Sequence, residues 1–340
     1  MSSVAAVATF FDRAGLTWFA PIIRLASGDD PLTQLKVIFQ TIGIPMLAMA
    51  GFLVLWNYSA AQVQTSLGAI PGPVAVWEEA KGLYQEHLRE REREKAFYQR
   101  QEKRNAARLE RDPDAEVRMR PYTGKPTYFD QIITSLQTVF LGFILATIVA
   151  VPLGIMCGLS TVVMSALNPI IQLFKPVSPL AWLPIVTLVV SAVYVTTPES
   201  WFSKAFLISA ITVTLCSLWP TLINTALGVA SIDTDLLNVS KALRLGWFTK
   251  VWKIVLPSSL PLIFTGLRLS LGVGWMVLIA AEMLAQNPGL GKFVWDEFQN
   301  GSSSSLGRIM VAVLTIGFIG FILDRLMLTL QQLVSHEQGR

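Results

Sequence analysis

The chain has 340 residues, of which 52% are hydrophobic and only 15% are charged, and its formal net charge is +4. With a mean hydropathy of +0.51, this composition excludes an ordinary soluble domain and indicates an integral membrane protein. The net charge is too small to suggest nucleic-acid binding unless a local basic patch supports it.

Residues 1–36 are expected to form an N-terminal amphipathic segment at the cytoplasmic face. The apolar stretch from Phe10 to Ala26 is interrupted by Asp12, Arg13 and Arg24. Such a pattern predicts a helix that lies on the membrane surface rather than a span. The order of charged, apolar and small residues that marks a cleaved signal peptide is not seen here.

Six apolar segments are long enough to cross a bilayer, because a span needs about 20 such residues. They are 37–57, 133–157, 168–193, 204–228, 261–283 and 307–330. The predicted fold is therefore an all-α polytopic membrane protein with six transmembrane helices. Residues 37–57 form the first helix, and residues 131–335 form a core of five more.

The distribution of Lys and Arg predicts the orientation of the spans. With the N-terminus in the cytoplasm, the inner segments hold nine Lys and Arg residues and the short outer loops hold three. The excess on the inner side favours cytoplasmic N- and C-termini.

Residues 58–130 form a charged outer loop with thirteen Lys and Arg residues, against eleven Asp and Glu residues between Glu78 and Glu116. Long loops cross the membrane largely regardless of charge, so this loop does not overturn the orientation. The run Glu86 to Lys95 predicts a solvated helix with opposite charges at i,i+3 spacing. A docking surface for a soluble partner is the alternative. RNA binding is disfavoured because the acids nearly cancel the bases.

Cys157 and Cys216 both lie in apolar segments, which favours packing over a disulfide or a metal pair. His87 and His336 are far apart and lie outside the spans, so no histidine-based catalytic or metal site is expected.

The basic amphipathic segment from Asn238 to Pro257 lies between the apolar segments 204–228 and 261–283. Asp233 offers N-cap chemistry just ahead of it. Helical spacing gathers Trp247 and its apolar neighbours on one arc, opposite Lys250 and Lys253. A break near Gly246 predicts two short helices instead of one. The residues alone leave two alternatives open: an interfacial anchor, or a segment that contacts a partner.

The order of motifs resembles the permeases of ABC importers of the type I fold, in the nitrate, sulfonate and bicarbonate branch. The resemblance covers roughly residues 130–335 and rests on Ser135 to Phe143, on Pro152-Leu-Gly154, on the proline-broken segment from Lys175 to Pro184, and on the segment from Asn238 to Pro261. Within the branch, Pro176 to Pro184, Leu237-Asn-Val239 and Val294-Trp-Asp-Glu297 are most similar to nitrate permeases and their bicarbonate relatives.

The family's cytoplasmic loop has the pattern Glu-Ala-Ala, three residues, Gly, nine residues, then an aliphatic residue, any residue and Leu-Pro. When the pattern is anchored on Leu256-Pro257, Ile254 matches the aliphatic position. Asn238-Val239-Ser240 and Arg244 depart from it, and Gly246 comes two residues after the family's glycine. The resemblance implies a coupling helix at about 235–257. Its residues assigned to ATPase contact are Asn238, Val239, Ser240, Lys241, Ala242, Leu243, Arg244, Leu245, Gly246 and Trp247.

The resemblance implies a permease subunit in the bacterial inner membrane that carries a small inorganic anion, with nitrate or nitrite first. Implied partners are a second permease copy, two ATPase subunits and a periplasmic or lipid-anchored solute-binding protein. The chain lacks the phosphate-binding loop Gly-x-x-x-x-Gly-Lys-Ser/Thr, so ATP and Mg would be used by the partner ATPases and the chain would be non-catalytic. A sulfonate, taurine or bicarbonate importer is the alternative, and a stand-alone channel is a further one.

The candidates for the translocation pathway are polar or aromatic side chains in the spans. They are Lys175, Ser178, Trp182, Thr187, Asn224 and Trp275. Lys175 leads because an ionisable residue at membrane depth is a functional candidate, and packing is the alternative for the others. Glu282 would repel anions in an open pore, so a hydrogen bond or a dock for the binding protein is expected there.

Overall fold

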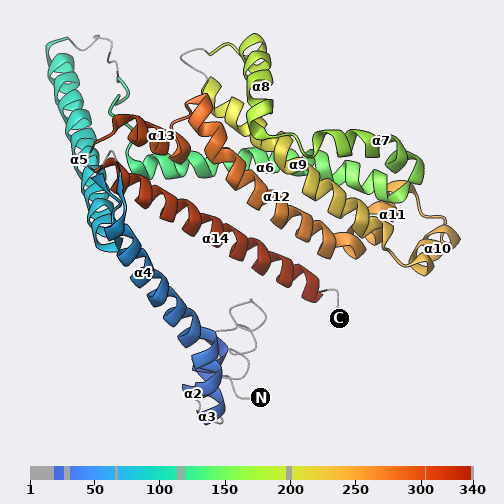
Figure 1. Ribbon diagram of the computed structural model, residues 1–340. Coiled ribbons are helices and arrows are strands. Elements are labelled where there is room, and N and C mark those ends of the chain that lie inside the picture. Colours follow the sequence, from blue (N-terminus) through green and yellow to red (C-terminus); the bar gives the residue numbers. More distant parts are fainter. Residues whose placement is uncertain are drawn as a thin grey trace.

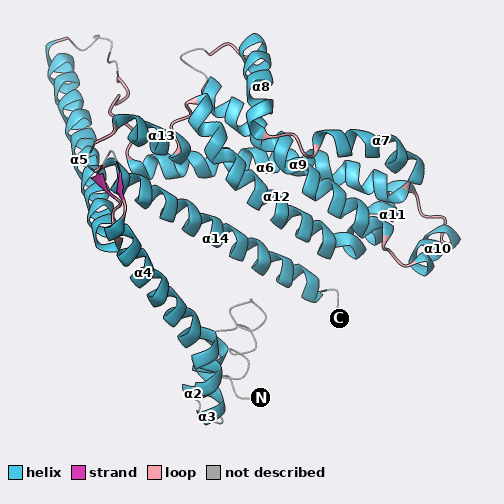
Figure 2. Cartoon of the chain, viewed as in Figure 1, coloured by secondary structure: helices cyan, strands magenta, loops and turns pink. Residues whose placement is uncertain are grey.

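The computed structural model describes residues 19–26, 31–65, 68–112, 117, 119–196, 201–302 and 304–337. The described part is almost entirely helical, as Figure 2 shows, and its strands are the antiparallel pair β1 (Gln64–Thr65) and β2 (Gly68–Ala69). The predicted surface helix from Phe10 lies mostly outside the described residues. Its described end is the helix α2 (Phe19–Ala26), followed by α3 (Pro31–Ile38).

The first predicted span is a helix and is longer than the apolar pattern indicated. α3 continues through a π-helical turn, η1 (Phe39–Gly43), into α4 (Ile44–Gln62). Together they form an apolar helical stretch from Pro31 to Gln62. α4 diverges from the other helices, as Figure 1 shows, and most of its side chains are exposed in the single chain.

The core is built from four long helices: α6 (Tyr128–Leu159), α9 (Lys204–Ala230), α12 (Leu256–Ala285) and α14 (Ser305–Glu337). α9 packs closely against α6 because glycines line their contact. A Cβ at Gly142 would come within 2.7 Å of the carbonyl oxygen of Ala210, and one at Gly154 would come within 2.8 Å of that of Leu222. Small residues that let helix backbones approach are typical of membrane bundles.

The third predicted span is a broken pair of helices. α7 (Thr161–Phe174) and α8 (Pro179–Val193) are bent by 101° relative to each other. Pro176 and Pro179 lie at the break and cannot donate to a continuous helix. The described residues therefore contain five helices long enough to span a membrane, or six when the bent pair is counted as one span.

The two ends of the core carry different structures, as Figure 1 shows. At one end, α5 (Pro73–Arg111) crosses the bundle next to α13 (Leu290–Asn300). At the other end lie α10 (Thr234–Ala242), α11 (Trp247–Lys250) and the C-terminus of α14. The charged helix predicted at Glu86 to Lys95 is confirmed, and it is part of the longer α5.

Candidate functional site: a basic elbow and the helix that it starts

The segment between α9 and α12 forms two short helices with a turn between them, which we call the elbow (residues 233–255). Asp233 is the N-cap of α10, and its carboxylate oxygen accepts a hydrogen bond from the backbone N–H of Asp235 at 2.9 Å. Gly246 is the N-cap of α11. Both the predicted cap and the predicted break near Gly246 are confirmed.

α10 ends in a Schellman turn whose left-handed residue is Arg244. The backbone N–H of Leu245 donates to the carbonyl of Ser240 at 3.0 Å, and that of Arg244 donates to the carbonyl of Lys241 at 3.0 Å. Arg244 has φ of +48°, a conformation in which helices usually place glycine. The loop pattern of the family that this chain resembles has its glycine at this position, and Arg244 adopts here a conformation that glycine adopts most easily.

The elbow has an anchored face and an open face. Ser240 and Val255 are buried, and Val255 packs with Ile155, Val229 and Ile232 at the ends of α6 and α9. The other residues assigned to ATPase contact are exposed, apart from half-buried Leu245. The open face mixes apolar side chains with basic ones, and Phe248 is 81% exposed. A surface patch of this kind is typical of a protein contact site or a membrane interface.

α11 runs without interruption into the fifth span. The π-helical turn η2 (Val251–Val255) joins α11 to α12, so one helical rod extends from Trp247 to Ala285. π-helical turns are rare and are found frequently at functional sites. A displacement of the elbow therefore acts directly on α12.

The far end of α12 holds a buried polar cluster around Glu282, which is fully buried. Its carboxylate accepts hydrogen bonds from the Ser135 hydroxyl at 2.8 and 2.9 Å and from the Gly291 backbone N–H at 2.9 Å. Ser135 in turn accepts from the N–H of Leu290 at 2.8 Å. These bonds join α12 to α6 and to the start of α13. Glu282 is thus held in hydrogen bonds, one of the two roles expected for it.

Two glycines allow that cluster to form. A Cβ at Gly289 would lie 2.1 Å from a carboxylate oxygen of Glu282, and one at Gly291 would lie 2.2 Å from the backbone oxygen of Ile279. Real Cβ contacts are never so short, so Gly289-Leu-Gly291 is needed for α13 to approach α12.

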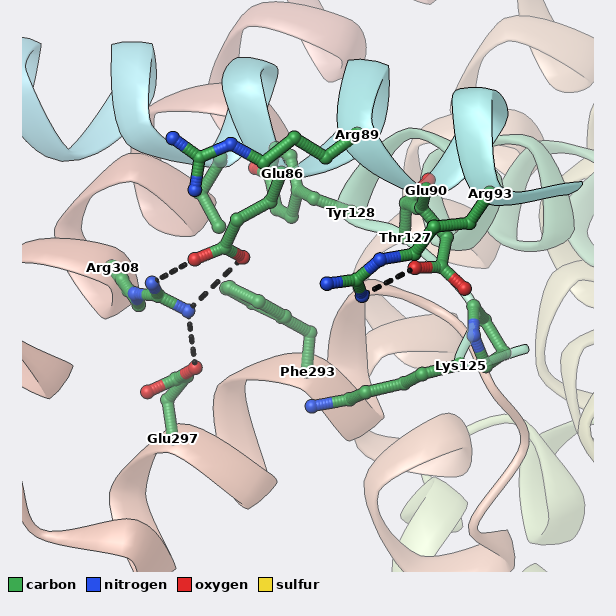
Figure 3. Close-up of a pocket in the computed structure, with 12 residues that line it drawn as sticks. Glu86, Arg89, Glu90, Arg93, Lys125, Thr127, Tyr128, Phe293, Glu297 and Arg308 are labelled. Carbon is green, nitrogen blue, oxygen red and sulfur yellow. Dashed lines mark hydrogen bonds and ion pairs between the residues drawn. The ribbon is translucent and has the colours of Figure 1, made fainter. Parts of the chain in front are cut away.

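Arg308 joins three elements at the end of the bundle opposite the elbow. Its guanidinium contacts Glu79 and Glu86 of α5 and Glu297 of α13. The contact with Glu79 is 3.5 Å, as is the contact with Glu297. Figure 3 shows Arg308 between Glu86 and Glu297 at the edge of a cavity of about 290 Å³. Lys125, Arg93 and Phe293 also line this cavity.

Three pathway candidates gather at the break between α7 and α8. Lys175 ends α7 and is exposed, and Ser178 caps α8 by accepting from the N–H of Leu180 at 3.3 Å. The ring of Trp182 lies 5.5 Å from that of Phe174, and its buried ring nitrogen has no hydrogen-bond partner in the described part of the chain. Thr187 lies further along α8 and is half-buried.

The other two candidates lie at helix contacts away from the break. Asn224 donates to the carbonyl of Pro220 at 2.8 Å, and its Cβ lies against Gly266 of α12. Trp275 is 5% exposed and donates to the carbonyl of Ile316 on α14 at 3.0 Å. Both positions have a packing contact that accounts for the side chain.

The polar cluster around Glu282 and the contacts of Arg308 bring together residues whose pairing the sequence analysis did not predict. Ser135, Glu297 and Arg308 were visible only as parts of motifs or as loop charges, and their partners lie far away in the chain. The one signal available in the sequence was the carboxylate of Glu282 within an apolar segment, followed by Gly289-Leu-Gly291. Among the described residues, no group of three or more His, Cys, Asp or Glu side chains is placed to hold a metal ion.

The family model described as "Binding-protein-dependent transport system inner membrane component" matches residues 150–336, more than half of the chain. The chain therefore belongs to this family and is a multi-pass protein of the inner membrane.

Among the relatives, the nitrate import permease protein NrtB of Leptolyngbya laminosa is 37% identical over 198 residues, which cover 58% of this chain and 66% of that protein. The bicarbonate transport system permease protein CmpB of Synechococcus elongatus is 32% identical over 316 residues, covering 91% of this chain and 95% of the relative. The chain thus spans about two thirds of one relative and nearly all of the other.

Among solved structures, the inward-facing MetNI methionine ABC transporter matches with a TM-score of 0.52 at 13% identity. The match covers 61% of this chain and 95% of the matched chain. At this identity the likeness shows a shared fold, which agrees with the expected type I permease architecture.

Proposed function

We propose that this chain forms the translocation pathway of an ATP-driven importer for a small inorganic anion, with nitrate or nitrite as the first candidate. The observation that carries the proposal is the family match together with an elbow that is continuous with the fifth span. The 37% identity to a nitrate import permease supports the choice of anion.

Bicarbonate is the second candidate, and one observation favours it. The alignment with the bicarbonate permease covers 91% of this chain, so it crosses residues 58–130, the charged loop that contains α5. The alignment with the nitrate relative covers only 58% of the chain. An alignment that continues through this loop is a reason to test both anions.

The proposed assembly contains two copies of this chain, two ATPase subunits and an extracytoplasmic solute-binding protein. One bent span and four long helices leave α8 exposed along much of its length, so a single copy does not enclose a pathway. ATP and Mg would be used by the ATPases, and this chain would catalyse no reaction. The elbow, the N-terminus and the C-terminus would lie in the cytoplasm.

The rod from Trp247 to Ala285 supplies a mechanism for coupling. ATP-driven closure of the ATPases would push the two elbows together, and each rod would transmit that displacement across the membrane. At its far end, Glu282 is bonded to Ser135 of α6 and to the start of α13. The displacement would therefore reach α6 and α13 at the outer end of the bundle as movement of packed helices.

The break between α7 and α8 suits an anion better than a cation. Lys175 brings a positive charge, Trp182 has a ring N–H without a partner among the described residues, and the N-terminus of α8 adds a positive helix dipole. An anion must leave water to cross, and donors that do not bind too tightly compensate for that loss.

The test is ATP hydrolysis by the assembled complex in nanodiscs with its solute-binding protein present. Nitrate or bicarbonate should stimulate hydrolysis, and taurine at the same concentration should not. Stimulation by taurine alone would overturn the anion assignment. Stimulation by none of the three would count against the proposed function as a whole.

The elbow and the break are tested separately. Charge reversal of Lys241, Arg244 and Lys250 should abolish copurification of the ATPase subunits, whereas Lys175→Ala should lower uptake and leave copurification intact. Wild-type copurification after charge reversal would remove the elbow from the ATPase contact.

A further inference from the structure

α5 has a different charge pattern in its two halves. Its first half alternates acids and bases, and several of its acids are engaged by Arg308 or by neighbours on α5 itself. Its second half contains four arginines at spacings of four, four and three residues, which we call the basic stripe: Arg100, Arg104, Arg108 and Arg111. At about 100° per residue these four side chains fall within an arc of about 80°.

The basic stripe is free of carboxylates. Glu102 and Glu110, the acids in this half of the helix, fall on other faces at the same helical spacing. All four arginines are exposed. In the described part of the chain none of them pairs with a carboxylate; Arg100 and Arg104 donate only to carbonyls of their own helix, at 3.0 and 3.3 Å.

The root of α5 is held firmly, so the stripe is presented in a defined place. Val76 and Leu83 are buried against the bundle, and Arg308 binds Glu79 and Glu86. Gln101 donates to the carbonyl of Arg120 at 3.3 Å. Figure 1 shows the second half of α5 continuing past α13, beyond the long helices of the core.

The stripe continues toward the cavity of Figure 3. Arg89 and Arg93 precede Arg100 by eleven and seven residues, so they share its face of the helix. Both line the cavity together with Lys125. The cavity itself is of mixed charge, because Glu86, Glu90 and Glu297 also line it and Arg93 pairs with Glu90 at 3.3 Å. The part of this face without carboxylates is therefore the basic stripe in the second half of α5.

A lipid surface does not suit this part of α5. A helix that binds the membrane interface has an apolar face opposite its basic face. From Glu102 to Arg111 the apolar side chains are two alanines and Leu109. The charge without an apolar face fits a soluble partner with an acidic surface.

We infer that the basic stripe is a docking surface for an acidic face of the solute-binding protein, at the outer end of this permease. The inference rests on the proposed function, which requires such a partner. Long-range attraction between the two surfaces speeds their encounter at the outer end of the bundle.

The experiment measures binding of the system's purified solute-binding protein to the complete permease–ATPase complex in nanodiscs. The triple variant Arg100→Glu, Arg104→Glu, Arg108→Glu should weaken binding by about tenfold or more. The wild-type affinity should fall as salt is raised, and that of the triple variant should change less. Arg104→Glu alone should weaken binding more than Lys95→Glu, which makes the same charge change on another exposed face of α5.

Basal ATP hydrolysis without binding protein serves as the folding control and should match the wild type in every variant. Wild-type affinity in the triple variant would overturn the docking surface while leaving the importer function intact. Equal effects of Arg104→Glu and Lys95→Glu on the affinity would also overturn it. So would a triple variant that loses binding to anionic vesicles but keeps the wild-type affinity for the binding protein. A wild-type complex that the binding protein neither binds nor stimulates would instead overturn the proposed function.

Discussion

At the residue scale, Arg244 occupies a backbone conformation that costs an L-amino acid about 1–2 kcal/mol. The turn needs this conformation because the N–H groups of Arg244 and Leu245 satisfy the last carbonyls of α10. Glycine adopts it freely, although glycine also gains entropy in the unfolded chain and so offsets part of the benefit.

Arg244→Gly should therefore leave the elbow as stable as the wild type or slightly more stable, and Arg244→Val should lower its stability by about 1–2 kcal/mol. Hydrogen exchange of the α10 amides in the purified protein measures the difference. Lys241→Gly is the control, because Lys241 is inside α10 and glycine there should cost about 1 kcal/mol. Faster exchange in Arg244→Gly than in the wild type, as in the control, would contradict the turn.

Gly291 is a second residue whose size matters. Gly291→Ala should destabilise the protein by about 1–3 kcal/mol, because the new methyl group would meet the backbone oxygen of Ile279, which cannot move aside alone. Gly272→Ala on α12 is the matched control, since a Cβ there meets nothing within 4 Å. The melting temperatures of the two purified variants make the comparison. Equal melting temperatures would show that α13 does not pack as described.

At the scale of elements, Arg308 keeps the root of α5 on the bundle. Arg308→Ala should leave Glu297, which is 7% exposed, without its cation and should loosen α5 by roughly 1 kcal/mol or more. Amide exchange over residues 78–91 should then become faster. Arg89→Ala removes a cation from the same cavity and should change little, because Arg89 has no carboxylate partner among the described residues. Unchanged exchange in Arg308→Ala would mean that apolar contacts alone hold α5.

Elements defined by local signals could be predicted from the sequence. The cap at Asp233, the break at Gly246 and the helix around Glu86 depend on neighbours within a few residues, and all three are confirmed. The position of each span follows from its apolar run, although helices such as α6 and α14 extend beyond it. The full extent of α5 could not be predicted, because its root is held by Arg308, more than two hundred residues away.

The candidate site was predictable only in part for the same reason. The position of the elbow followed from its basic amphipathic pattern and from the motif order. The hydrogen bonds between Ser135 and Glu282 join residues 147 apart in the chain, and no local pattern specifies such a pair. Likewise, the prolines between α7 and α8 predict a break but not its angle of 101°.

At the scale of the whole molecule, the elbow and α5 lie at opposite ends of the bundle, as Figure 1 shows. The rod from Trp247 to Ala285 runs from the elbow to Glu282, which is bonded to the start of α13. Arg308 in turn joins α13 to α5, so a chain of contacts links the two ends. This arrangement gives the proposed importer its direction only if the elbow is in the cytoplasm and α5 is outside.

Single cysteines at Phe248 in the elbow and at Glu102 on α5 test that orientation. Both side chains are exposed, whereas Cys157 is buried and Cys216 half-buried within the spans. A maleimide that cannot cross membranes should label Glu102→Cys but not Phe248→Cys in intact spheroplasts, and the reverse in inverted vesicles. Labelling of Phe248→Cys from outside would put the elbow out of reach of any ATPase, because ATP and its motors are cytoplasmic. The parent protein, carrying only its own two cysteines, should stay unlabelled on both sides.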